Sequence, residues 1–268
     1  MGSGIAQITA QCNFKTVLFD LNEEVLSKSR LLIQNSLQLL TTKGKLSEEA
    51  KEQTLNNLLF TSNLNDCKAD LIIEAIIESK EAKLNLFKQL EQLNNSETIF
   101  ASNTSSISIN ALSAEMQYPQ QFAGMHFFNP ATVMKLVEVI KADKTSDAVA
   151  EQLCLLSKAL GKIPVVCKDA PGFIVNRVAR HYYLEAMKLV ELNLATIENV
   201  DAVMEASGFK MGPFKLMDLI GLDINYNVSQ IVWNDLGKPE RLKPSTIQQQ
   251  KVEAKELGKK TGKGFYNY

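Results

Sequence analysis

In the first 168 residues, segments with apolar residues at helical spacing alternate with short apolar runs that resemble strands. Apolar side chains recurring every third or fourth residue predict amphipathic helices, and short runs rich in Val, Ile, Leu and Phe predict strands. The segment 70–75 is apolar at three consecutive positions, as expected for a strand covered on both faces of a parallel sheet. We therefore expect helices at residues 4–12, 23–40 and 80–93, and strands at residues 15–20, 70–75, 98–102, 121–125, 135–140 and 163–167.

This alternation ends at Asp169-Ala-Pro-Gly-Phe173, where Pro and Gly interrupt the pattern. Beyond this segment the strand-like runs stop and only helical spacing remains. Strands that alternate with helices are typical of doubly wound sheets. The sequence therefore predicts an α/β domain with a doubly wound, Rossmann-type parallel sheet at residues 1–168, followed by an all-α domain at residues 169–268. In the second domain we expect helices at residues 174–191, 196–207, 213–233 and 244–257.

Composition narrows the possible partners. The net charge of −1 over 268 residues gives no electrostatic reason to expect nucleic acid or an anionic membrane, and no apolar run is long enough to span a bilayer. Neither histidine has the spacing to a cysteine that a zinc site needs, so we expect no metal. The cysteines are far apart and fit reduced, mostly buried thiols of a cytoplasmic protein: Cys12, Cys67, Cys154 and Cys167.

The segment 123–140 carries the strongest candidate chemistry. His126, one of two histidines, lies in an apolar run, and Glu138 lies twelve residues later in an equally apolar run. A histidine and a carboxylate that both have to be buried tend to satisfy each other. Such a pair is a common way to build a general base near neutral pH. On its own, His126 can equally be a core residue with a satisfied ring, and Glu138 a carboxylate at a strand edge.

The start of the chain indicates a dinucleotide site. In a Rossmann fold, a strand and a Gly-x-Gly-x-x-Gly turn precede a helix, and the next strand ends in an acid that binds the ribose hydroxyls. Asp20 ends a predicted strand and follows Gly2 by 18 residues, and its charge favours NAD over NADP. Gly2 would be the third glycine, so the first strand is expected ahead of residue 1. Alternatively, Asp20 is only the N-cap of the following helix.

Five motifs span nearly the whole chain: Met-Gly-Ser-Gly-Ile-Ala-Gln at residues 1–7, Ser-Asn-Thr-Ser-Ser at 102–106, His-Phe-Phe-Asn-Pro at 126–130, Pro-Gly-Phe-Ile-Val-Asn-Arg at 171–177, and Gly-Lys-Lys-Thr-Gly-Lys-Gly-Phe-Tyr at 258–266. Together they resemble the 3-hydroxyacyl-CoA dehydrogenase family, which includes the 3-hydroxybutyryl-CoA dehydrogenases. The chain departs from the family at its front, where family members carry further residues with the first strand and the remaining glycines.

The resemblance implies a role for each matching residue. His126 would be the catalytic base, Glu138 its orienting carboxylate, and Ser105 and Asn176 hydrogen-bonding partners of the substrate oxygen and the imidazole region. The cofactor would be NAD, contacted by Gly2, Asp20, Glu78, Lys83, Asn103, Ser105 and Lys260. The substrate would be an acyl-CoA thioester, contacted by Ser36, Lys43, Ser105 and Asn129. Family members dimerise through the helical domain, so the resemblance also implies a homodimer.

Two other functions remain open from the sequence. One is a β-hydroxyacid dehydrogenase, which combines a Rossmann domain with helices but uses a catalytic lysine and acts on free acids. The other is a non-catalytic homologue with an incomplete NAD site. The pairing of His126 with Glu138 and the motif at residues 126–130 favour the thioester dehydrogenase.

Overall fold

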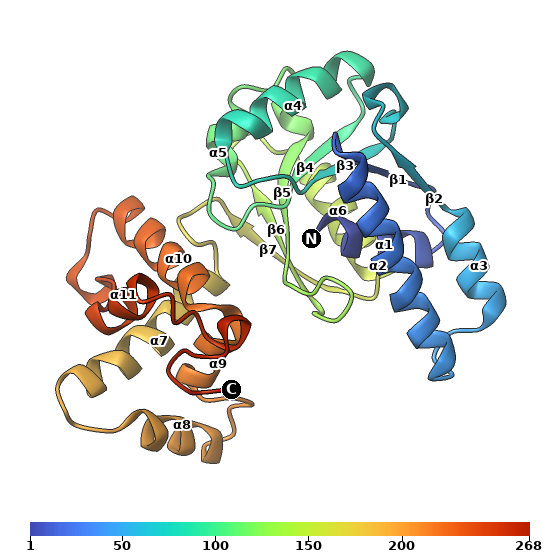
Figure 1. Ribbon diagram of the computed structural model, residues 1–268. Coiled ribbons are helices and arrows are strands. Elements are labelled where there is room, and N and C mark those ends of the chain that lie inside the picture. Colours follow the sequence, from blue (N-terminus) through green and yellow to red (C-terminus); the bar gives the residue numbers. More distant parts are fainter. The chain divides into compact units, whose positions relative to one another are not determined.

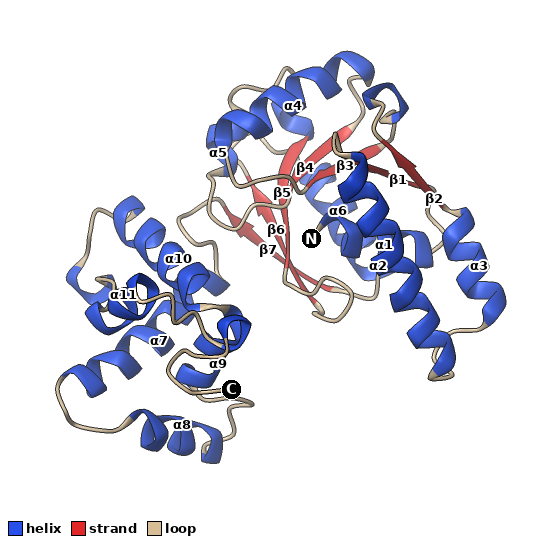
Figure 2. Ribbon diagram, in the orientation of Figure 1, coloured by secondary structure: helices blue, strands red, loops and turns tan.

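The computed structural model describes residues 1–268, and the chain divides into two compact units (Figures 1 and 2). The first unit is Met1–Asp169 and the second is Ala170–Tyr268. The division falls one residue after the boundary that the sequence predicts. Every strand belongs to the first unit, and the second unit is built from helices.

The first unit alternates helices and strands, with an additional helix where the chain returns from β1 to β2. Its strands are β1 (Thr16–Phe19), β2 (Leu58–Thr61), β3 (Leu71–Glu74), β4 (Ile99–Ser102), β5 (Phe122–Phe127), β6 (Leu136–Lys141) and β7 (Ile163–Lys168). Its helices are α1 (Gly2–Gln11), α2 (Glu23–Thr42), α3 (Glu48–Asn56), α4 (Lys80–Leu93), α5 (Ile109–Ser113) and α6 (Asp147–Ala159).

The strands form two sheets. β1 and β2 pair in parallel, and β3-β4-β5-β6-β7 form a five-stranded sheet in sequence order. No strand in residues 1–268 pairs with both β1 and β3, so the sheet is divided at the position where the first Rossmann strand is expected. The β5–β6 pair is antiparallel, unlike the other pairs. The predicted Rossmann-type sheet is confirmed, with this pair as a departure from a purely parallel sheet.

Helices cover both faces of the five-stranded sheet (Figure 1). On one face, α1 and α6 pack on the central strands, and their apolar residues join one core. On the other face, Phe87 of α4 makes edge-to-face contacts with Phe100 of β4 and Phe122 of β5, at ring-centroid distances of 6.1 and 5.0 Å. Burial on both faces explains why these strands read as continuous apolar runs.

The second unit packs its helices around α7, and its core is a separate apolar cluster. Its helices are α7 (Val175–Glu191), α8 (Ile197–Ala206), α9 (Pro213–Ile220), α10 (Leu222–Asp235) and α11 (Thr246–Glu253). The expected single helix at 213–233 is wrong. Gly221 adopts φ 103° and divides this segment into α9 and α10, because this backbone conformation cannot continue a helix and favours glycine.

Four elements have no counterpart among the predicted ones: α3, β2, α5 and α6. β2 is only four residues long, and α3 is largely polar with one buried residue, so neither has a strong apolar period. The expectation of mostly buried cysteines is also not met. All four cysteines are half-buried free thiols.

Candidate active site

His126 and Glu138 lie directly opposite each other on β5 and β6. The antiparallel register pairs their Cα atoms, and His126 Nδ1 lies 2.8 Å from Glu138 Oε2. Both side chains are buried, with residue exposures of 7% and 0%. A carboxylate can only accept a hydrogen bond, so Nδ1 carries the ring proton and the lone pair of the neutral imidazole is on Nε2. The pairing that the sequence predicts is therefore present in the fold.

The loop after β4 folds around the carboxylate of Glu78. Glu78 Oε1 accepts hydrogen bonds from Thr104 Oγ1 at 2.5 Å, Ser105 N at 3.0 Å and Ser106 Oγ at 2.9 Å. Burial, the largest influence, raises the pKa of Glu78, but these hydrogen bonds and the charge of Lys83 together lower it below its usual value. Glu78 is therefore an anion that holds this loop in place.

Lys83 is completely enclosed, with a side-chain exposure of 0%. Its Nζ atom lies 2.7 and 2.9 Å from the two carboxylate oxygens of Glu74 and 3.4 Å from Glu78 Oε2. Glu74 also accepts from Ser102 Oγ at 2.7 Å and from the main-chain nitrogen of Ile76 at 2.6 Å. The resemblance assigns Lys83 to the cofactor, and this role stays a prediction; in the fold Lys83 pairs mainly with Glu74 and at a longer distance with Glu78.

These groups lie together at the carboxyl ends of β3 and β4. Glu74 and Ser102 are the last residues of the parallel strands β3 and β4. Asn103, which follows β4, accepts a hydrogen bond from the main-chain nitrogen of Phe127 at 2.8 Å, next to His126 on β5. Asn103 thus joins the Glu78 loop to the strand that carries the histidine. In open α/β sheets, ligands bind outside the carboxyl ends of the strands, which is where this cluster lies.

The amino end of α1 suits the pyrophosphate of a dinucleotide. Helix α1 begins at Gly2, has no side-chain cap at Met1 and has no acidic residue in its first turn. The positive end of a helix dipole and the N–H groups of a first turn favour an anion such as a phosphate. Asp20, just after β1, is half-buried and accepts from the main-chain nitrogen of Asn22 at 2.9 Å. Asn22, rather than Asp20, is the N-cap of α2, which corrects the alternative in which Asp20 caps that helix.

The residues predicted to contact acyl-CoA are spread over the first unit. Ser36 on α2 is half-buried, and its Oγ accepts from Gln7 Nε2 at 3.0 Å. Lys43, at the end of α2, is exposed, as is Asn129 in the loop after β5. The structure brings none of these three into contact with another, so their role in binding CoA remains a prediction.

Asn176 belongs to the second unit, in the first turn of α7. Its main-chain oxygen accepts from Nε of Arg180 at 3.0 Å. Arg180 is buried and also donates to the main-chain oxygen of Asn225 at 2.8 Å and to Ser229 Oγ at 2.9 Å. Burial lowers the pKa of this guanidinium to about 10. The side chain of Arg180 thus links the first turn of α7 to α10.

Lys260 lies in the C-terminal tail and forms an ion pair with Asp223, with Nζ–oxygen distances of 2.6 and 2.7 Å. The tail itself is held by the buried carboxylate of Asp218, which accepts from the main-chain nitrogens of Phe265 and Tyr266 at 2.9 Å each. Lys260 therefore occupies a fixed position on the second unit, where its predicted role toward NAD is untested.

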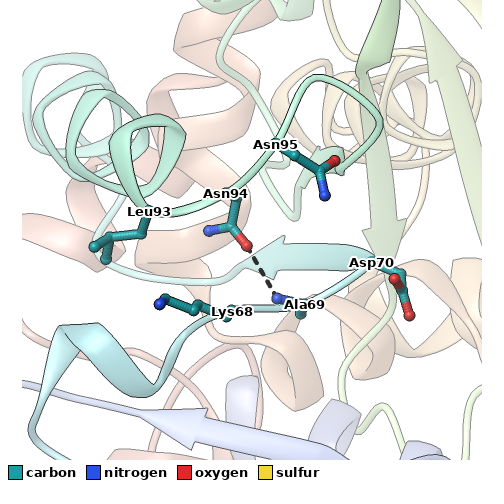
Figure 3. Close-up of a pocket in the computed structure, with 6 residues that line it drawn as sticks. All are labelled: Lys68, Ala69, Asp70, Leu93, Asn94 and Asn95. Atoms are coloured by element: carbon teal, nitrogen blue, oxygen red, sulfur yellow. Dashed lines mark hydrogen bonds between the residues drawn. The ribbon is translucent and has the colours of Figure 1, made fainter.

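A surface pocket of about 500 Å³ lies away from these residues (Figure 3). Its lining comes from the segment before β3 and the end of α4: Lys68, Ala69, Asp70, Leu93, Asn94 and Asn95. Asn94 points across it and accepts from the main-chain nitrogen of Ala69 at 3.0 Å (Figure 3). The pocket is at the amino end of β3, opposite to the edge that carries Glu74, and it contains no predicted site residue.

Glu74 is the residue of the cluster that sequence reasoning missed. The signal was nevertheless present, because Glu74 is an acid at the end of the apolar run Leu71-Ile-Ile-Glu74. Glu138 stands out in the same way, as an acid within an apolar strand. A lone acid in such a run has to find a buried partner, and for Glu74 that partner is Lys83.

Comparison with known proteins agrees with this geometry. Residues 1–170 match the family model described as the NAD binding domain of 3-hydroxyacyl-CoA dehydrogenase, and residues 172–268 match its C-terminal domain. The chain belongs to the 3-hydroxyacyl-CoA dehydrogenase family. The first unit is the NAD-binding domain of this oxidoreductase family, so the cofactor is NAD.

Individual relatives cover the whole chain. A 3-hydroxyadipyl-CoA dehydrogenase from Escherichia coli K12 is 44% identical over 100% of this chain and 57% of its own length. A probable 3-hydroxybutyryl-CoA dehydrogenase from Deinococcus radiodurans is 42% identical over 100% of this chain and 96% of its own length. The crystal structure of a 3-hydroxybutyryl-CoA dehydrogenase from Escherichia coli K12 superposes with a TM-score of 0.98 at 45% identity, covering 100% of this chain and 57% of that one.

Two further observations bear on the expected partners. None of the helices combines the length and apolar character needed to cross a lipid bilayer. No group of three or more His, Cys, Asp or Glu side chains is arranged to hold a metal ion.

Proposed function

We propose that the chain is an NAD-dependent dehydrogenase that interconverts (S)-3-hydroxyacyl-CoA and 3-ketoacyl-CoA, with short acyl chains of the 3-hydroxybutyryl type. The observation that carries this proposal is the buried His126–Glu138 pair at the carboxyl edge of a nucleotide-binding sheet. The relatives named as 3-hydroxybutyryl-CoA dehydrogenases support the short chain length.

In the proposed mechanism, His126 moves the proton of the substrate hydroxyl. Oxidation of a secondary alcohol removes a proton from oxygen and a hydride from carbon, and bound NAD supplies the hydride acceptor. The lone pair on Nε2 of His126 takes the hydroxyl proton near neutral pH. Glu138 holds the ring through Nδ1 at 2.8 Å and stabilises the imidazolium that forms. In the reverse direction, the imidazolium returns the proton to the oxygen.

Other residues of the chain would hold the reactants. Ser105 and Asn176 are hydrogen-bond donors of the kind that stabilise the substrate oxygen when it gains negative charge. The hydrogen bond from the Ser105 main-chain nitrogen to Glu78 supports a fixed position for its loop. Ser36, Lys43 and Asn129 would contact the CoA thioester, and Asp20 the adenosine ribose.

The first prediction concerns the reaction itself. NADH consumption, followed by absorbance, should be rapid with acetoacetyl-CoA and negligible with free acetoacetate. His126→Gln should lower kcat by about 10²- to 10⁴-fold, because the proton donor and acceptor is lost, while the Kd for NADH stays within about twofold. Turnover of the free acid but not of the thioester would instead indicate a β-hydroxyacid dehydrogenase. Wild-type turnover by His126→Gln would refute the assigned base.

We also infer that two chains form a homodimer through the helical unit, and that the protein works in a reducing compartment such as the cytoplasm. Exposed apolar residues on the second unit support the dimer: Val178, Leu192, Leu194, Val203 and Phe209. Four free cysteines without a disulfide support the compartment.

A further inference from the structure

The cluster at the carboxyl ends of β3 and β4 contains three charges that do not cancel. Glu74 and Glu78 each contribute one negative charge, and Lys83 contributes one positive charge. Lys83 is nearest to Glu74, with both carboxylate oxygens within 2.9 Å, and its contact with Glu78 is longer at 3.4 Å. The cluster therefore carries one net negative charge, and the geometry assigns most of it to Glu78.

Only one of the three groups can meet a ligand. The side chains of Glu74 and Lys83 have an exposure of 0%, whereas that of Glu78 is 37% exposed. A buried charge is tolerated only when it is paired, and Glu74 and Lys83 pair with each other. Glu78 is thus the exposed charge of the cluster. The buried ion pair of Glu74 and Lys83 determines how much of the negative charge of Glu78 is neutralised by Lys83.

We propose that Glu74 is a positioning residue that holds Lys83 as its main partner, so that Glu78 keeps most of its negative charge toward the nicotinamide and favours the oxidised cofactor. This inference rests on the proposed function and on the resemblance, which assigns Glu78 to the NAD site and which we take to place it on the nicotinamide side. The oxidised nicotinamide ring is a cation and the reduced ring is neutral, so a negative charge beside the ring distinguishes the two forms. Lys83, predicted as a cofactor contact, then acts through Glu78.

The substitution Glu74→Gln tests the charge with little change of shape. The amide oxygen can still accept from the main-chain nitrogen of Ile76 and from Lys83, and the hydroxyl of Ser102 can turn to accept from the amide nitrogen. The second hydrogen bond of Lys83, to Oε2, is lost because an amide nitrogen only donates. The net charge of the cluster becomes zero. We expect the ratio of NAD⁺ affinity to NADH affinity to fall about tenfold, as expected for removal of one unit charge at short range in a partly polar environment.

The double substitution Glu74→Gln/Lys83→Met is the matched control. It removes both buried charges, replaces the ion pair with groups that pack without charge, and restores a net charge of −1. The affinity ratio should therefore return to within about twofold of wild type. A purely structural role of Glu74 would weaken both nucleotides equally and would not be rescued by a second core substitution.

The measurement is the Kd of NAD⁺ and of NADH for each full-length variant, by titration calorimetry and nucleotide fluorescence. An unchanged ratio in Glu74→Gln, or an equally reduced ratio in the double variant, would overturn the role of Glu74 while leaving the dehydrogenase intact. If the wild-type chain binds NADH and reduces acetoacetyl-CoA, but neither variant changes the ratio of NAD⁺ affinity to NADH affinity, the role of Glu74 is refuted and the proposed function stands. If the wild-type chain bound neither nucleotide, the proposed function would fail with it.

Discussion

Asp20 has a backbone partner of its own besides its predicted ligand. One of its carboxylate oxygens accepts from the main-chain nitrogen of Asn22 at 2.9 Å, which fixes the turn between β1 and α2. An amide oxygen can make the same bond. Asparagine at this position would therefore keep the turn and remove only the negative charge, which separates a structural role from a role in cofactor choice.

We predict that Asp20→Asn lowers the affinity for NADH and raises the relative affinity for NADPH. The ribose hydroxyls lose a charged acceptor, and the repulsion of a 2′-phosphate disappears. The free energy of unfolding should change by less than about 0.5 kcal/mol, because the turn is kept. Kd values for both reduced nucleotides and a denaturant titration give the readouts. An unaltered preference for NADH over NADPH would rule out the ribose assignment.

At this scale, sequence reasoning succeeds where a polar residue is conspicuous against an apolar background. His126 and Glu138 are of this kind, and the structure pairs them. It fails where a partner comes from a surface-like segment. Lys83 lies in a helix with polar neighbours, and nothing in its surroundings in the chain indicates that it is completely buried.

Helices α7 and α11 are joined by one carboxylate. Glu191, the last residue of α7, accepts from Ser245 Oγ at 2.7 Å and from the nitrogen and hydroxyl of Thr246 at 3.1 Å each, at the start of α11. Burial, the largest influence, raises the pKa of Glu191, but the hydrogen bonds from Ser245, Thr246 and the backbone outweigh it and lower that pKa.

A lowered pKa in the folded state means that the ionised carboxylate stabilises the fold. This contribution is complete above the unfolded-state pKa of about 4.3 and is lost as the pH falls through the lower folded-state pKa. Glu191→Gln should therefore reduce the free energy of unfolding at pH 7, and the difference from wild type should shrink as the pH approaches 3. Denaturant titrations at several pH values provide the measurement, and a difference that is constant with pH would contradict this linkage.

Among the elements, length and amphipathic period decide what the sequence reveals. The predicted helix at residues 80–93 coincides with α4, because its apolar residues recur at helical spacing and Ser79 caps it. The predicted helix at 213–233 is divided in two because α9 and α10 are both helical and only the backbone of Gly221 separates them. A single glycine inside a helical pattern is often tolerated, so the pattern gave no reason to divide it there.

At the scale of the whole molecule, the helical unit carries several exposed apolar side chains. Val178 and Leu192 lie on or just after α7, and Val203 lies on α8. We predict a stable homodimer by sedimentation at micromolar concentration, and Val178→Lys or Val203→Glu should favour the monomer because a buried unpaired charge is costly. The equivalent change at Leu31 on α2, which is also exposed but on the first unit, should leave the dimer intact. A monomeric wild-type chain would contradict the inference.

The fold class and the division into two units can be predicted from the sequence, because they depend only on the order of segments with helical and strand-like spacing of apolar residues. The directions of individual strand pairs do not. The connection between β5 and β6 contains no helix, and this is the only local sign that the pair is antiparallel. The roles of Ser105 and Asn176 rest on resemblance rather than on any pattern in the chain.

The antiparallel β5–β6 pair also bears on the order in which the site forms during folding. His126 and Glu138 are only 12 residues apart, and two strands joined by a short connection can pair before distant segments meet. The Ser102–Glu74 bond spans 28 residues and needs the crossover through α4. We therefore expect His126 and Glu138 to come together early, and the loop around Glu78 to form only when the parallel sheet closes.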